Sequence, residues 1–161
     1  MQFEFVDLDL YGRTVILAKA RSLEDLAADL RVVSQHFVLA VAANTTTVAG
    51  PALVDMAGQL IRRGASYVCC WGPDCSRLHD CFDEADFVVN GESTDDRVLM
   101  TTWHNDDYLE EMFGFALEST VPSPDYFAST RAVVIATIGN ADWASRAKQY
   151  LASRARSRNE S

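Results

Sequence analysis

The stretch VVIATIGNADW, residues 133–143, decides the fold of this chain. Its first six residues are apolar or β-branched, as in a strand buried on both faces, and the rest are polar, aromatic or turn-forming. YVCCWGPD at residues 67–74 and VLMTTWHND at residues 98–106 have the same construction. A helical pattern follows each stretch, so the sequence predicts parallel strands that end in loops at one edge of a sheet.

Other segments fit the same alternation of strand and helix. Further strands are predicted at residues 13–18, 37–42 and 86–89. Ser22 is expected to cap a helix whose apolar stripe is Leu23, Leu26, Leu30 and Val33. Three more helices are predicted at about residues 51–63, 73–82 and 106–119, and a last helix carries Trp143, Ala144, Ala147 and Leu151.

This alternation predicts right-handed βαβ units and therefore an α/β three-layer sandwich. The expected sheet is mostly parallel, Rossmann-like or flavodoxin-like, with five or six strands and helices on both faces. A chain of 161 residues is one domain by length. We expect a single domain over residues 1–155 and a disordered tail over residues 156–161.

Composition limits the classes of partner and the compartment. The net charge of −9 opposes contact with phosphate backbones, so we expect no nucleic-acid partner. The chain has neither a signal-peptide pattern nor an apolar run of about 20 residues, so no membrane association is expected. Its four cysteines are crowded between Cys69 and Cys81, which favours a cytoplasmic location.

Several common cofactor motifs are absent from the sequence. There is no phosphate-binding Gly-x-x-x-x-Gly-Lys-Ser/Thr loop, and no Gly-x-Gly-x-x-Gly segment follows the first strand. Neither His-Glu-x-x-His nor Cys-x-x-Cys occurs. We therefore expect no cofactor.

A thiol at the strand edge is one candidate for chemistry. Cys70 ends a predicted strand beside a sharp turn, where a helix N-terminus can lower the pKa of a thiol. His104 and Asp106 follow another strand, so a Cys70, His104 and Asp106 set could assemble as nucleophile, base and orienting acid. The alternative, which we favour, is that Cys69 and Cys70 are small apolar side chains of a core strand.

A metal is a second candidate. Cys75 and His79 stand at i and i+4 on one helical face, and Cys70 or Cys81 with His104 could complete a tetrahedral set. The paired spacing of zinc sites is absent, however, and a domain of this size does not need a metal to fold. No metal is expected.

The third candidate is a group of aromatic and polar side chains that follow the predicted strands. Aromatic rings beside amides and carboxylates can bind a flat polar ligand such as a nucleobase or a sugar. The predicted ligand-binding residues are Trp71, Asp74, Trp103, Asn105 and Asn140. Helix capping explains most of the polar residues equally well, but it does not require two tryptophans at two strand ends.

Two hypotheses of function follow. The first is a non-catalytic module that binds a small molecule or a protein at the carboxyl edge of its sheet. The second is a small hydrolase or glycosyl-transfer enzyme that uses Cys70, His104 and Asp106 on a nucleoside-like or acyl substrate. A short contact between Cys70 and His104 would favour the enzyme, and separate burial of the two would favour the binding module.

Overall fold

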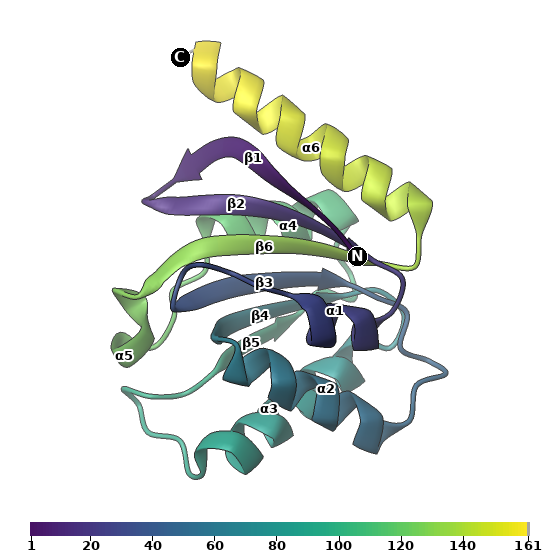
Figure 1. The fold of residues 1–161 in the computed structure, drawn as a ribbon, viewed down its shortest axis with the longest axis vertical. Helices are drawn as coiled ribbons and strands as arrows, with labels where there is room; N and C mark the ends of the chain where they lie inside the picture. Colours follow the sequence, from purple (N-terminus) through teal and green to yellow (C-terminus); the bar gives the residue numbers. More distant parts are fainter. Residues whose placement is uncertain (161) are drawn as a thin grey trace.

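A six-stranded sheet with helices on both faces forms the protein, in a computed structural model that describes residues 1–160 (Figure 1). The predicted α/β three-layer sandwich with a mostly parallel sheet is confirmed. The strands are β1 (Gln2–Leu10), β2 (Arg13–Ala20), β3 (His36–Ala42), β4 (Ala65–Trp71), β5 (Met100–Trp103) and β6 (Thr130–Ile138). No helix of the described residues combines the length and the apolar character needed to cross a bilayer.

The strand order is β1-β2-β6-β3-β4-β5, and only the β1–β2 pair is antiparallel. The most apolar run of the sequence is therefore β6, which lies between β2 and β3. Ile135 of β6 is opposite Leu17 of β2 and Ala40 of β3, and its side chain is completely buried. This placement agrees with a central strand covered by helices on both faces.

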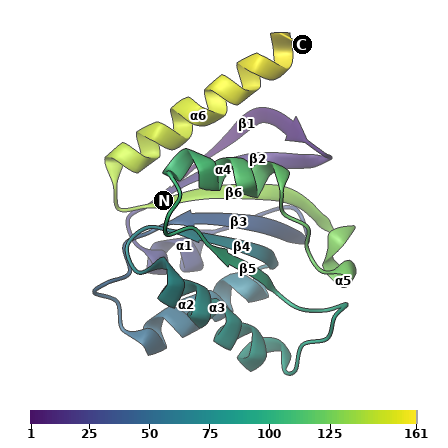
Figure 2. The ribbon, with the colours of Figure 1, turned by 180° about the vertical axis from the view of Figure 1, so that it is seen from behind.

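The two faces of the sheet are covered by different helices (Figures 1 and 2). We call one side of the sheet the α1–α3 face, and its core packs against α1, α2 and α3 through Leu26, Leu53 and Leu78. The other side is the α4–α6 face, and its core packs against α4 and α6 through Met112 and Leu151. The helices are α1 (Leu23–Asp29), α2 (Gly50–Arg62), α3 (Cys75–Asn90), α4 (Leu109–Glu118), α5 (Pro124–Phe127) and α6 (Ala141–Glu160).

The N-terminal strand β1 was not predicted from the sequence. It pairs with β2 through a hairpin whose corner is Tyr11-Gly12, and both corner residues have positive φ. Leu8 and Leu10 are buried, but Phe3 and Phe5 are exposed because β1 lies at the edge of the sheet. The hairpin places β1 beside α6 (Figure 1).

The predicted strand at residues 86–89 is wrong, because α3 continues through these residues to Asn90. Leu78, Phe82 and Ala85 extend one buried helical stripe past the expected end at residue 82. Asp86 is buried beyond them, where its carboxylate accepts a hydrogen bond from the backbone N–H of Leu99 at 3.1 Å. The long helix serves as the crossover that makes β4 and β5 parallel.

Three predicted helix ends also differ from the structure. α1 ends at Asp29, so Val33 lies beyond the helix and is exposed rather than part of its apolar stripe. α4 begins at Leu109 rather than near residue 106. Residues 156–160, expected to be a disordered tail, continue α6 as helix, and Ser161 lies outside the described residues. Alanine and arginine favour helix, and cations near a helix C-terminus suit its dipole.

Candidate functional site

The carboxyl ends of the five parallel strands form one edge of the sheet, where open α/β folds bind ligands. A crevice opens between neighbouring strands when their chains leave toward opposite faces. After β2 and β3 the chain passes to α1 and α2 on one face, whereas after β6 it passes to α6 on the other. A second divergence lies between β4, which leads to α3, and β5, which leads to α4.

The β4–β5 divergence contains most of the residues that the sequence singled out. Cys70 is completely buried in the core of the α1–α3 face, and its burial raises the pKa of its thiol well above the usual value. Cys69 is completely buried on the α4–α6 face, where desolvation raises the pKa of its thiol to about 12. Neither environment favours a thiolate.

His104 lies on the opposite face of the sheet from Cys70. Its ring contacts Phe115 of α4, with centroids 4.9 Å apart. Its Nδ1 is 2.7 Å from a carboxylate oxygen of Asp107, and its Nε2 is 2.9 Å from the hydroxyl of Thr102. Both ring nitrogens therefore have partners, while Asp106 is exposed. The structure does not bring Cys70, His104 and Asp106 together as a catalytic set.

The two tryptophans lie at the same end of the sheet but on opposite faces. Trp71 donates its indole N–H to the Asp107 carbonyl at 2.9 Å and makes an edge contact with Trp143, with centroids 5.2 Å apart. Trp103 lies against His79 of α3, with centroids 4.6 Å apart, and is half-exposed. They cannot form two walls of one pocket.

The three polar residues predicted to bind ligand have different local roles. Asp74 precedes α3 with a φ of 66° and accepts a hydrogen bond from Arg77 Nε at 2.7 Å. Asn105 is exposed in the loop after β5. Asn140 caps α6, because its side-chain oxygen accepts the backbone N–H of Trp143 at 3.0 Å.

The burial of the thiols predicts slow alkylation. In the folded protein at pH 8, Cys69 and Cys70 should both react slowly with iodoacetamide, because burial raises the pKa of both thiols. For Cys69, a pKa of about 12 leaves only about one thiolate in ten thousand. Mass spectrometry of the alkylated peptides measures both rates, with the denatured protein as the control for intrinsic reactivity. Faster labelling of Cys70 than of Cys69 in the folded protein would restore the nucleophile hypothesis.

The metal ligands suggested by the sequence also separate. Cys75 is buried in the core of the α1–α3 face, whereas His79 lies at the surface between Asp80 and Asp83. The ligand atoms of His79, Asp80 and Asp83 lie within 4.8 Å of one another. Each nitrogen of the His79 ring faces a different carboxylate, at 2.9 Å and 3.7 Å, so the acids of the cluster already engage both ring nitrogens.

The crevice around β6 contains the larger cavities of this edge. One of about 600 Å³, the α1–α2 cavity, lies between the two helices for which we name it. Its apolar lining comprises Leu23, Val48, Ala52, Met56 and Ile138. Its polar and turn residues are Arg21, Ser22, Glu24, Asn44, Asp55, Gln59 and Gly139. This combination of an apolar surface and a few polar groups is typical of small-molecule sites.

Local backbone geometry holds this cavity open. Ser22 accepts the backbone N–H of Asp25 at 3.1 Å and so fixes the start of α1, as the sequence predicted. Gly139 has a φ of +62°, and its N–H donates to the Ala20 carbonyl at 2.8 Å, which ties the β6 loop to the end of β2. A side chain at Gly139 would also meet the Arg21 carbonyl at 3.0 Å. Glycine is therefore required at this turn.

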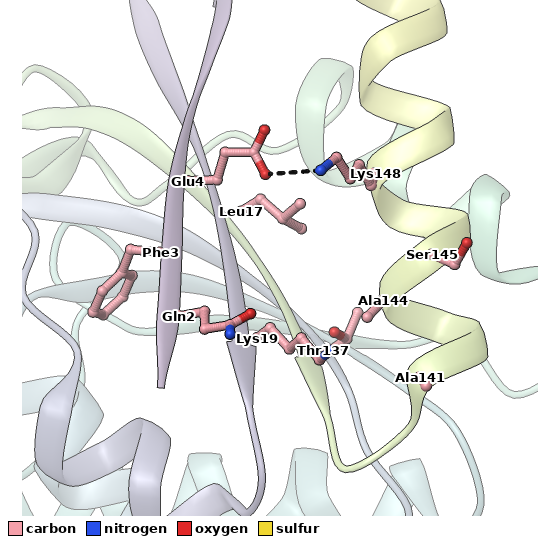
Figure 3. Close-up of a pocket in the computed structure, with 10 residues that line it drawn as sticks. All are labelled: Gln2, Phe3, Glu4, Leu17, Lys19, Thr137, Ala141, Ala144, Ser145 and Lys148. Atoms are coloured by element: carbon pink, nitrogen blue, oxygen red, sulfur yellow. Dashed lines mark ion pairs between the residues drawn. The ribbon is translucent and has the colours of Figure 1, made fainter.

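Two further cavities continue along the same edge. One of about 460 Å³ lies at the ends of β2 and β6 and is lined by Asn140, the only predicted ligand-binding residue found in these cavities. Another of about 620 Å³, the α6 cavity, lies between β1, β2, β6 and the first turns of α6 (Figure 3).

Sequence reasoning did not select the polar residues of the α1–α2 cavity. Asn44 follows the apolar run of β3 as Trp103 follows that of β5, so the same signal was present. Arg21 directly follows β2 and so carried this signal as well. Asp55 and Gln59 had no such signal, because α2 brings them to the edge. Their contribution depends on which face each helix covers.

Comparison with known proteins identifies the family of the chain. A family described as a domain of unknown function, DUF7684, matches residues 13–154. The match covers most of the chain, which therefore belongs to this family. It begins at the first residue of β2 and so leaves β1 outside. No curated protein was found to match the chain.

Proposed function

We propose that this DUF7684 chain is a non-catalytic binding domain that takes a small polar molecule into its α1–α2 cavity. The observation that carries the proposal is the position of this cavity of about 600 Å³ at the carboxyl edge of β2, β6 and β3. Ligands of open α/β sheets bind where the chain leaves neighbouring strands toward opposite faces. The cavity also has the size of known small-molecule sites.

The lining favours a neutral ligand with one apolar face. Val48, Met56 and Ile138 offer an apolar surface. Asn44 offers its side-chain amide N–H groups, since its Oδ1 already accepts from Thr46. Gln59 offers its side-chain carbonyl, since its Nε2 donates to Asp55 at 2.9 Å. The charged groups are Arg21, Glu24 and Asp55, one cation against two anions. An anionic ligand would be repelled by this balance, so we infer a nucleoside- or sugar-sized molecule without a phosphate.

A catalytic role has little support at this cavity. The side chain of Ser22 already accepts a hydrogen bond as the cap of α1. The lining of the cavity contains neither cysteine nor histidine. Cys70 and His104 lie at the β4–β5 divergence instead, on opposite faces of the sheet. Four buried free thiols suit a reducing compartment, which supports a cytoplasmic location.

Filling the cavity should abolish ligand binding. Ala52 is exposed on α2 at the rim of the α1–α2 cavity, so the indole of an Ala52→Trp variant would occupy the space of a ligand. We expect a nucleoside or sugar from a panel of adenosine, guanosine, cytidine, uridine, ribose and glucose to stabilise the native chain. The gain is about 2.7 kcal/mol at a ligand concentration near 100 Kd. Thermal unfolding should show no such gain for Ala52→Trp.

The matched control is Ala152→Trp, the same substitution at an exposed position of α6, far along the helix from its first turn. This variant should respond to the ligand as the native chain does. Equal stabilisation of Ala52→Trp and the native chain would place the ligand elsewhere. If no member of the panel stabilises the native chain, the proposed ligand class is wrong.

A further inference from the structure

The α6 cavity has a different chemistry from the α1–α2 cavity and lies on the other face of the sheet. Leu17 of its floor belongs to the core of the α4–α6 face, whereas Leu23 of the α1–α2 cavity belongs to that of the α1–α3 face. Its walls are β1 and β2 on one side and Ala141, Ala144, Ser145 and Lys148 of α6 on the other (Figure 3). An inference about it is therefore independent of the proposed function.

Both lysines of the chain line this one cavity. The other twelve of the fourteen basic residues are arginines, and none of those twelve lines it. Lys19 is exposed at the end of β2, and Lys148 projects from the second turn of α6. A lysine ammonium is a compact point charge that suits an anionic group. In a chain of net charge −9, two lysines against Glu4 give this cavity a positive lining.

Thr137 supplies an unused hydrogen-bonding group at the base of the cavity. It is opposite Lys19 across the β2–β6 ladder, and both residues line the cavity. Its side chain is 99 % buried, since its relative exposure is 1 %. Within residues 1–160, its hydroxyl is the one buried side-chain N or O atom without a hydrogen-bond partner. Such a group is costly to bury unless a ligand or another partner satisfies it.

The start of α6 adds a third feature of an anion site. The first backbone N–H groups of a helix have no acceptor within the helix, and the helix dipole gives this end a partial positive charge. The side-chain oxygen of Asn140 accepts the N–H of Trp143. The N–H groups of Ala141 and Asp142 lie between these two residues and are not used by this cap. Ala141 itself lines the cavity. This helix runs for 20 residues, so its dipole is well developed.

We propose that the α6 cavity binds a small oxyanion, the phosphate or carboxylate group of a small molecule. Lys19, the hydroxyl of Thr137 and the first turn of α6 would contact its oxygens. Lys148 is 3.8 Å from Glu4, and this ion pair lies across the cavity (Figure 3). The oxyanion competes with Glu4 for Lys148, so Glu4 weakens the site by repulsion and by pairing.

The test is a titration of the ¹⁵N-labelled chain with inorganic phosphate and, separately, with acetate, at constant ionic strength. We expect the backbone amides of Thr137, Ala141 and Asp142 to shift with a Kd on the order of millimolar for at least one anion. The anion that binds tighter identifies the chemical class. Lys19→Met should raise Kd about tenfold and Thr137→Val about fivefold. Glu4→Gln should lower Kd about threefold, because it frees Lys148.

Arg131→Met is the matched control, because it removes one exposed positive charge from the opposite end of β6. Its Kd should stay within about twofold of the native value. Thr137→Val should not lower the midpoint of thermal unfolding, since the lost hydroxyl has no partner. Failure of both anions to shift these amides at about 20 mM would overturn the proposal. Equal weakening of anion binding by Lys19→Met and Arg131→Met would also overturn it, because net charge alone would then explain the change in Kd.

Discussion

An Ile135→Ala variant is expected to lose about 2–5 kcal/mol of unfolding free energy, from lost transfer energy and the cavity left behind. Ile135 is completely buried in β6, between β2 and β3, and belongs to the core of the α4–α6 face. A domain of this size has about 5–15 kcal/mol of total stability, so the loss is a large share of it. Chemical denaturation with urea measures the difference from the shift in midpoint.

Arg156→Ala provides the comparison for that experiment. Arg156 is exposed near the end of α6, so its replacement should change the unfolding free energy by no more than about 0.5 kcal/mol. If Ile135→Ala moves the midpoint no more than Arg156→Ala does, β6 is not the central strand. The carboxyl edge around β6 would then lose its support as a site.

A Gly72→Ala variant should cost about 2–5 kcal/mol, because two penalties act together. Gly72 has a φ of +115°, a backbone conformation that residues other than glycine rarely adopt. A Cβ at this position would also lie 2.2 Å from the Ala43 carbonyl oxygen, which belongs to the backbone after β3. The loop would have to move away from β3. This movement would strain the hydrogen bond that the Ala43 N–H donates to the Trp71 carbonyl at 3.0 Å.

Gly50→Ala is the matched control for Gly72→Ala. Gly50 is the first residue of α2, its φ is not positive, and an added Cβ would meet no atom within 4 Å. The substitution should leave stability unchanged or raise it by about 0.4–1 kcal/mol. Thermal and urea unfolding of both variants should show a loss of stability for Gly72→Ala and no loss for Gly50→Ala. Equal effects at the two glycines would mean that the close approach of the β3 and β4 loops is wrong.

The parallel strands β3, β4 and β6 could be predicted from the sequence because their apolar runs are buried on both faces. The β6 run and the runs of β3 and β4 end in turn residues, and the structure places all three in the sheet. The edge strand β1 escaped because its charged side chains and exposed Phe5 resemble a solvated segment. A strand was wrongly predicted at Val88-Val89, which belong to α3, because two neighbouring β-branched residues favour a strand when they are considered alone.

The candidate site was harder to predict than the fold. The sequence indicates which residues follow strands, but consecutive side chains of a strand point to opposite faces. Cys70 and Trp71 are therefore adjacent in the chain and separated by the sheet. The helix crossovers decide where the edge diverges, and that depends on the strand order, in which β6 enters between β2 and β3. A single sequence gives no direct signal of that order.

Chemical-shift mapping of the ¹⁵N-labelled chain with the nucleoside or sugar that stabilises it most shows where on the sheet edge the ligand binds. We expect the largest changes at the backbone amides of Asn44, Met56 and Gly139, which line the α1–α2 cavity. The indole N–H signals of Trp71 and Trp103 at the β4–β5 divergence should remain in place. The largest changes at those two indoles and at His104, with none at Gly139, would contradict binding in the α1–α2 cavity.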